Sequence, residues 1–295
     1  MALRGVTGTY GIGVRGADEP NKLVAARRGS PRCGGVGNDE YVVASDASAI
    51  IEHTANVIYL NDNEMAVITR DGMRTMTIDN VPVSKEVEQI EWSLEEIALG
   101  GFDHFMLKEI FEQPRAVADT LEGRIGANRV LEEAFGAGAG EIFDQISGVH
   151  IIACGTSYHA GMVGRYWLES LAGIPCSVEV ASEFRYRHPV VRNNSLIVTL
   201  SQSGETADTL AGLQEAKRLG YGSSLSICNV PESSLVRASD LVLMTHAGPE
   251  IGVASTKAFT TQLVAMLLLT IVLGRRYAMS AVTAARPVNG PCRCP

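Results

Sequence analysis

The sequence lacks a hydrophobic run long enough for a membrane span and has few aromatic residues. Aromatic residues make up 6% of the 295 positions. The most apolar stretch, 263–273, is eleven residues long, whereas a membrane-spanning helix needs about 20. The N-terminal stretch is glycine-rich and lacks the apolar segment of a secretory signal. We therefore expect a cytoplasmic protein with no membrane partner, in which 263–273 belongs to a buried helix.

An excess of positive charge is also missing. The chain has 25 Lys and Arg against 33 Asp and Glu, which gives a formal net charge of −8. This balance argues against a nucleic-acid partner, while it leaves room for a local phosphate pocket. Hydrophobic residues make up 46% of the chain, which predicts a filled core rather than disorder. The length suits two domains, or one domain and part of another.

Dense sets of cysteine or histidine are lacking as well. The cysteines are dispersed, apart from a final pair: Cys33, Cys154, Cys176, Cys228, Cys292 and Cys294. This spacing does not suit a small disulfide-stapled domain, and the six histidines do not show metal-ligand spacing. We expect reduced thiols, no metal and no other cofactor.

Residues 1–83 carry short apolar runs separated by Gly, Asn and Asp, which predicts antiparallel sheet. The Asp71-Gly72 step predicts a hairpin turn, because Gly tolerates positive φ. The expected strands are 9–14, 41–44, 56–60, 65–68 and 73–78.

Residues 84–130 predict a helical connector. Apolar residues recur at helical spacing over 85–99, and shorter helices are expected over 102–111 and 115–121. Pro114 suits the first turn of the last helix, so a break is expected just before it.

Strands and helices alternate over 131–276. Continuous apolar strands joined by helices predict an α/β domain with a doubly wound parallel sheet. Its ligand should lie beyond the carboxyl ends of the strands. Residues 277–295 predict a disordered tail. The expected strands are 149–153, 176–180, 195–200, 224–228 and 241–244, and the helices 158–171, 206–219 and 257–273.

The strongest motif is SQSGET at 201–206, between a buried strand and a helix. A strand-to-helix turn directs free backbone N–H groups and the positive end of the helix dipole at one point. Hydroxyl and amide side chains add donors, so the turn predicts an anion cradle that needs little basic charge. Helix capping explains one hydroxyl, but not all of Ser201, Gln202, Ser203 and Thr206.

Two further turns follow strands at the same edge. In the first, Thr156 and Ser157 either cap the next helix or reach a bound hydroxyl. The second, 250–260, opens the apolar helix; backbone groups near Val253 and the side chain of Ser255 are candidates for sugar contacts. Lys257 is either a surface residue or a Schiff-base amine, of which the surface or structural role is preferred.

Arg185 and Arg187 lie beside aromatic residues and either contact a phosphate or belong to a solvated loop, the preferred interpretation. Cys154 is interpreted as a packed structural thiol.

At these loops the sequence resembles the sugar isomerase (SIS) family of phosphosugar-binding domains. More closely, it is similar to the glutamine-dependent amidotransferases that form glucosamine 6-phosphate. The matching segments are CGTS at 154–157, EFRY at 183–186, SQSGETADT at 201–209, EIGVASTKAFT at 250–260 and KEIFEQP at 108–114. The resemblance runs from the N-terminus to about residue 274.

The resemblance implies a domain plan. It makes 1–83 the C-terminal half of a glutaminase domain, 84–130 a connector, 131–276 a SIS domain and 277–295 an aberrant tail. It also implies fructose 6-phosphate and glucosamine 6-phosphate as ligands, glutamine as a substrate of the full-length enzyme, and a homodimer. The implied phosphosugar contacts are Thr156, Ser157, Ser201, Gln202, Ser203, Thr206, Val253 and Ser255.

The chain departs from the family at both ends. The N-terminal cysteine nucleophile and the second SIS domain are not found, so the catalytic residues stay unassigned. The expectation is a chain that binds the phosphosugar and is inactive alone. Two rivals remain: a non-catalytic phosphosugar-binding regulatory module, and a stand-alone phosphosugar isomerase with Glu205 or Glu250 as base.

Overall fold

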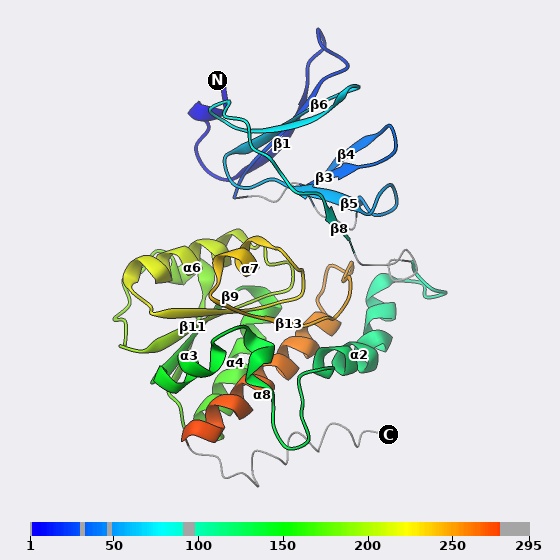
Figure 1. Ribbon diagram of the computed structural model, residues 1–295. Helices are drawn as coiled ribbons and strands as arrows, with labels where there is room; N and C mark the ends of the chain where they lie inside the picture. The colour runs from blue at the N-terminus through cyan, green and yellow to red at the C-terminus, as the bar shows by residue number, and fades with distance from the viewer. Residues whose placement is uncertain (1, 30–32, 46–48, 91–97, 278–295) are drawn as a thin grey trace. The chain divides into compact units, whose positions relative to one another are not determined.

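The computed structural model describes residues 2–29, 33–45, 49–90 and 98–277. The chain divides into two compact units, Met1–Ala98 and Leu99–Pro295, which are coloured along the chain in Figure 1. The predicted tail 278–295 lies outside the described residues.

The first unit contains two antiparallel sheets of four strands, in the orders β1-β2-β6-β7 and β4-β3-β5-β8. Its apolar side chains form two small clusters, one within the sheet that contains β3 and one that joins the sheet of β6 to β4. The strands are β1 (Tyr10–Arg15), β2 (Leu23–Arg28), β3 (Cys33–Val36), β4 (Tyr41–Ala44), β5 (Asn56–Tyr59), β6 (Glu64–Thr69), β7 (Gly72–Thr77) and β8 (Glu88–Gln89), after a short 3-10 helix η1 (Ala2–Gly5).

The predicted hairpin is present between β6 and β7, where Thr69 pairs with Gly72. Its two turn residues are Arg70 and Asp71, so the turn lies one residue before the predicted step. Gly72 begins β7 with a φ of 149°, within the region that favours glycine.

The prediction of a helix over 85–99 is wrong at its start. Glu88 and Gln89 form β8, which pairs with β5. Ile90 packs against the cluster around Val57. Tertiary burial here outweighs the helical period, and residues 91–97 lie outside the described residues.

The predicted break at 112–114 is also wrong, because α2 (Phe105–Leu121) runs through Pro114 as one helix. Proline has no N–H for the carbonyl four residues earlier, that of Ile110. The side-chain Nε2 of Gln113 donates to that carbonyl instead, at 3.0 Å.

The second unit is built on a five-stranded parallel sheet in the order β10-β9-β11-β12-β13. The predicted α/β class and doubly wound parallel sheet are confirmed. The strands are β9 (Gly148–Ala153), β10 (Cys176–Val180), β11 (Ser195–Ser201), β12 (Ser223–Cys228) and β13 (Leu241–Met244); the helices are α2, α3 (Ala139–Gln145), α4 (Gly155–Ser170), α5 (Ala181–Phe184), α6 (Ala207–Leu219), α7 (Ser234–Ala238) and α8 (Lys257–Tyr277), with a 3-10 turn η3 (Glu132–Phe135).

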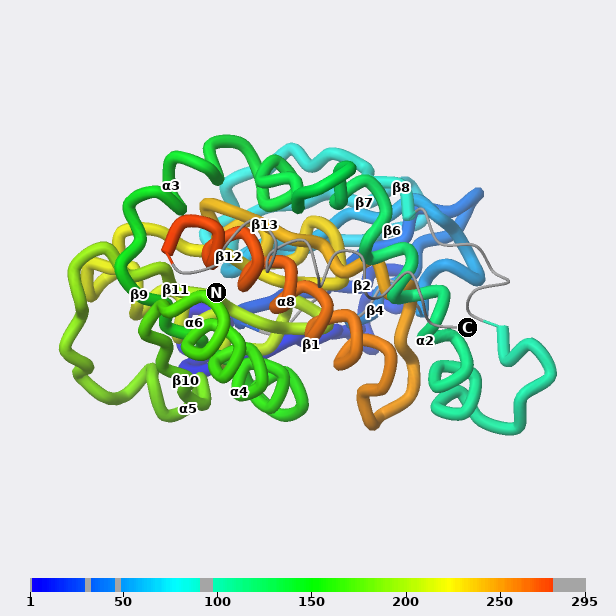
Figure 2. The backbone as a smooth tube through the Cα atoms, turned by 90° about the horizontal axis from the view of Figure 1, so that it is seen from below, coloured from blue at the N-terminus to red at the C-terminus, as the bar shows by residue number. Residues whose placement is uncertain are grey.

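Helices cover both faces of this sheet. The larger core cluster joins the sheet to α3, α4 and α8, and the smaller one joins it to α5 and α6, as Figure 1 shows. The helix α8 is long and apolar enough to cross a membrane by length and composition, but 72% of its apolar window is buried inside the unit. It packs against α4 and α2, and Figure 2 shows the three helices together.

Candidate phosphosugar site

The candidate site lies at the carboxyl edge of the parallel sheet. Strands β9 and β11 are neighbours, with Ala153 paired to Leu200. The turns that follow them, 154–157 and 201–206, therefore leave the sheet side by side. This is the edge at which a doubly wound sheet binds ligands.

The 201–206 turn is held by its own side chains. Ser201 is buried, and its Oγ accepts the backbone N–H of Gly204 at 3.0 Å and lies 3.4 Å from the Thr206 hydroxyl. The Ser203 Oγ accepts the N–H of Glu205 at 3.2 Å. Ser201 thus shapes the turn, while Gln202, Ser203 and Thr206 stay half-exposed.

The start of α6 follows directly on the 201–206 turn. Thr206 occupies the N-cap position, yet its side chain makes no capping hydrogen bond to this helix. The capping interpretation of Thr206 is therefore not supported. Uncapped N–H groups of the first turn, beside two half-exposed hydroxyls, form the donor set that an anion needs.

Gly204 allows the turn to approach its neighbours. Its φ is 66°, and a Cβ placed there would lie 2.0 Å from the Ser233 Oγ and 2.7 Å from the Cys228 Sγ. The Glu205 carboxylate accepts from the Ser234 N–H at 2.8 Å and from the Ser234 hydroxyl. Glu205 thereby fixes the turn to the start of α7, which is a structural role.

In the turn after β9, the two candidates differ. Thr156 is exposed on the first turn of α4. Ser157 is buried, and its Oγ accepts from the Nε2 of Gln262 on α8 at 3.0 Å. Thr156 is thus accessible at the carboxyl edge of the sheet, and Ser157 joins two helices.

The loop 250–256 precedes α8 and is organised by carboxylates. Glu250 accepts from the Ser255 hydroxyl at 2.9 Å and from the N–H groups of Thr256 and Ala258 at 2.8 and 3.0 Å. Glu250 therefore caps the start of α8. Val253 is fully exposed at the tip, and Ser255 is half-buried and engaged with Glu250.

Lys257 is buried, so the surface interpretation is wrong for it and the structural one holds. Its Nζ lies 2.6 Å from the Glu112 Oε2 of α2. A charged amine in that pair is held by its counter-ion, which does not suit a Schiff-base nucleophile.

Asn229, at the end of β12, was not singled out from the sequence. Its backbone N–H donates to the carbonyl of Gln202 at 3.3 Å. Its side chain donates to the Gly248 carbonyl at 2.7 Å and accepts from the Thr245 hydroxyl and the Ala247 N–H at 3.0 and 2.7 Å. Asn229 therefore connects the 201–206 turn to the segment that leads into the loop 250–256. A single buried amide has no pattern by which sequence reasoning finds it.

The arginines beside the aromatic residues are both ion-paired, and Arg187 is also exposed, as the prediction of a solvated loop expects. Arg185 lies 2.7 Å from Asp208 on α6, and Arg187 pairs with Glu179 on β10. Neither is placed as a free phosphate ligand.

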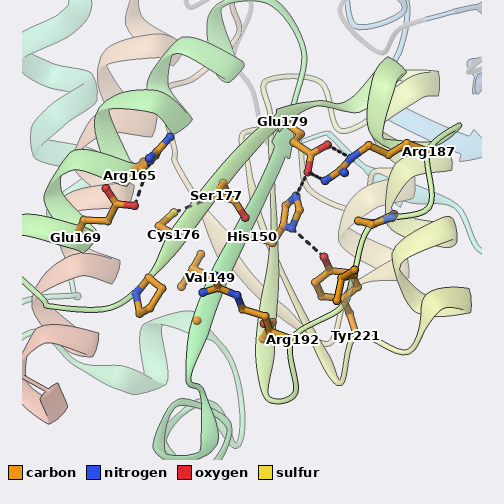
Figure 3. Close-up of a pocket in the computed structure, with 15 residues that line it drawn as sticks. Val149, His150, Arg165, Glu169, Cys176, Ser177, Glu179, Arg187, Arg192 and Tyr221 are labelled. Atoms are coloured by element: carbon orange, nitrogen blue, oxygen red, sulfur yellow. Dashed lines mark hydrogen bonds and ion pairs between the residues drawn. The ribbon is translucent and has the colours of Figure 1, made fainter.

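A cavity of about 340 Å³ lies away from the predicted residues, among the first residues of β9, β10 and β11. Figure 3 shows Glu179 between Arg187 and His150, with Tyr221 on the other side of the imidazole. The Nε2 of His150 lies 2.9 Å from Glu179, and its Nδ1 is 2.8 Å from the Tyr221 hydroxyl. Burial lowers the pKa of His150, and Glu179 offsets part of that effect. Carboxylates neutralise much of the positive charge of the arginines that line this cavity. We therefore interpret the cavity as structural.

Comparison with known proteins identifies the family that the second unit resembles. Residues 143–272 match the family profile of the SIS domain. These residues form a SIS domain. The match takes in β9 to β13 and most of α8, and with them all three turns of the candidate site.

Curated relatives are named as aminotransferases. The chain is 58% identical over 274 residues to the glutamine–fructose-6-phosphate aminotransferase (isomerizing) of Pseudomonas syringae pv. tomato, and 57% identical to that of Pseudomonas aeruginosa. Each match covers 93% of this chain and 45% of the relative. The chain thus spans less than half the length of these curated relatives, and the resemblance inferred from its motifs is confirmed.

One solved structure is similar in fold to this chain. The C-terminal domain of glucosamine-fructose-6-phosphate aminotransferase from Francisella tularensis superposes with a TM-score of 0.64 at 49% identity. The superposition covers 66% of this chain and 55% of that one.

Proposed function

We propose that the SIS domain of this chain binds fructose 6-phosphate, as the phosphosugar-binding part of a glutamine-dependent enzyme that forms glucosamine 6-phosphate. The observation that carries the proposal is the open start of α6, where uncapped N–H groups adjoin Ser203 and Thr206 in a SIS domain. The names of the relatives supply the substrate.

In the proposed complex, the phosphate lies against the start of α6, where Gln202, Ser203 and Thr206 surround it. Thr156 and the tip at Val253 are directed to the sugar hydroxyls. Binding the phosphate away from the reacting carbons holds those carbons in register for transfer of ammonia and the proton shift that follows.

The stand-alone isomerase is less well supported. It needs a base, and the two carboxylates considered for that role are engaged in the fold. Glu205 accepts from Ser234, and Glu250 accepts from the N–H groups that open α8.

Calorimetric titration with fructose 6-phosphate and glucose 6-phosphate tests the proposal. Replacing Ser203 removes a donor to a charged group, so Ser203→Ala should weaken binding by about 1–3 kcal/mol. Ser170→Ala is the matched control, because Ser170 is exposed near the far end of α4 and its hydroxyl bonds to the carbonyl of Tyr166. Equal affinity in wild type and Ser203→Ala would overturn the assignment of the 201–206 turn.

A turnover assay addresses the larger reaction. The purified chain is incubated with glutamine and fructose 6-phosphate, and glucosamine 6-phosphate is measured. Since the chain aligns with 45% of its relatives' length, we expect binding without turnover; product formation would extend the proposal from binding to catalysis.

A further inference from the structure

The loop 250–256 is held from outside the parallel sheet by the helix α2. The Glu109 carboxylate on α2 is buried, and its Oε1 accepts two consecutive backbone N–H groups. The N–H of Ile251 lies at 2.6 Å and that of Gly252 at 2.9 Å. These bonds join positions more than 140 residues apart, so they fix the loop to an element distant in sequence.

The rest of α2 strengthens this attachment. Glu112 pairs with Lys257 at 2.6 Å, and the Gln113 Oε1 accepts from the Thr260 hydroxyl at 2.6 Å. One face of α2 thereby contacts the loop and the first turn of α8 at successive points. Glu109 is the one of these residues that bonds to the loop itself.

The contact between Glu109 and Gly252 leaves almost no free space. A Cβ on Gly252 would lie 2.6 Å from the Glu109 Oε2. That oxygen is buried and has no hydrogen-bond partner among the described residues. A charged oxygen without a bond in a buried place is costly, so packing alone does not account for a glutamate here. The bonds made by Oε1 give the reason for the charge.

Both ends of the loop are thus held by carboxylates, Glu109 before the tip and Glu250 after it. Val253 and Ala254 between them are exposed. A short exposed tip between two fixed ends loses little conformational entropy when a ligand binds. Charge-assisted bonds to backbone N–H groups are the strong kind.

We propose that Glu109 is a positioning residue for the phosphosugar site, acting through the backbone of Ile251 and Gly252 to hold the loop 250–256 in its binding conformation. This rests on the proposed function. Glu109 does not touch the sugar; it presents the loop tip to the sugar, whereas the 201–206 turn binds the phosphate.

The experiment compares two probes on the full chain, fructose 6-phosphate and inorganic phosphate. Glu109→Ala should lower the affinity for fructose 6-phosphate by roughly tenfold or more. Affinity for inorganic phosphate, which needs only the 201–206 turn, should change less than twofold. Asp119→Ala is the control, because it removes a carboxylate from α2 whose partner is Arg115 rather than the loop.

Two further variants separate positioning from folding. Glu109→Gln keeps an acceptor oxygen for both N–H groups and should recover most of the lost affinity. Gly252→Ala forces a clash with Oε2 and should reproduce the loss of affinity, while the double variant Gly252→Ala with Glu109→Ala should bind no worse than Glu109→Ala alone.

The outcomes are distinguishable. Wild-type protein that does not bind fructose 6-phosphate contradicts the proposed function. Wild-type binding with equal affinity in Glu109→Ala overturns the positioning role alone. Parallel loss of both probes in Glu109→Ala also overturns it, because it indicates general damage to the domain.

Discussion

Gly204 is a position where the backbone of the candidate site approaches another segment closely. Its positive φ is one constraint, and the Ser233 Oγ, which lies 2.0 Å from the point that a Cβ would occupy, is another. Gly220 shares only the first, since its φ is 92° and nothing lies within 4 Å of its Cβ position. Comparing alanine substitutions at Gly204 and Gly220 therefore separates the cost of conformational strain from the cost of overpacking.

Gly204→Ala should therefore lower the free energy of unfolding by about 1–3 kcal/mol more than Gly220→Ala, because overpacking adds to strain. Chemical denaturation of both variants measures the difference. Equal losses would show that Ser233 moves aside at no cost.

His150 gives stability a pH dependence. Its folded pKa lies below the ordinary value of about 6.5 because the ring is buried beside Tyr221 and Phe184. Glu179 opposes this lowering of the pKa, and Arg187 adds to it. Between the two pKa values the unfolded chain binds more protons than the folded one, so stability is lost as the pH falls through that window.

Thermal unfolding between pH 7.5 and 5 tests this. His150→Gln should flatten the pH dependence below about 6.5, and His159→Gln, at an exposed position on α4, should leave it unchanged. An identical slope in wild type and His150→Gln would contradict the role of this ring.

At the scale of elements, the pattern of apolar residues predicted the parallel sheet because its central strands β9, β11 and β12 are buried on both faces. The expected strand over 195–200 is β11 almost residue for residue, and all of it is buried. In the first unit, β2 ends in two arginines and β3 contains two glycines. Neither strand has the apolar alternation by which a strand is recognised in a sequence. Arg27 is buried and pairs with Asp62, which lies 35 residues away in the sequence.

The sequence predicts one part of the candidate site and misses another. The 201–206 turn carries its signal in one short segment. Glu109 and Asn229 act on loops far from them in sequence, and only the fold brings those partners together. Local patterns contain no information on such bonds.

In the helix α2, Gln113 supplies the hydrogen bond to the Ile110 carbonyl that Pro114 cannot donate. Gln113→Ala removes the donor to the Ile110 carbonyl and the acceptor for Thr260, and should destabilise the chain by about 1–2 kcal/mol. In a Pro114→Ala background the new N–H satisfies the Ile110 carbonyl, so Gln113→Ala should cost less there. A double-mutant cycle by denaturation measures the coupling, and strict additivity would refute it.

At the scale of the whole molecule, each apolar cluster draws its members from one unit. The clusters around Val57 and Leu60 lie within the first unit, and those around Ile151 and Ile152 lie within the second. The second unit thus has its own core, as an independent domain does.

A protein of residues 99–277 should therefore fold alone and bind fructose 6-phosphate within about threefold of the full chain, which is below about 1 kcal/mol. Circular dichroism and calorimetry check the two parts of this expectation. An unfolded product, or one that folds without binding, would contradict this expectation.

The hollow among Arg165, Arg187 and Arg192 has a practical meaning for screening. It lies where the parallel strands begin, and the turns of the candidate site lie where they end. A fragment bound in this cavity would be separated from the proposed fructose 6-phosphate site by the length of the strands. Compounds found there would label or stabilise the domain without competing with fructose 6-phosphate, so a displacement assay alone would overlook them.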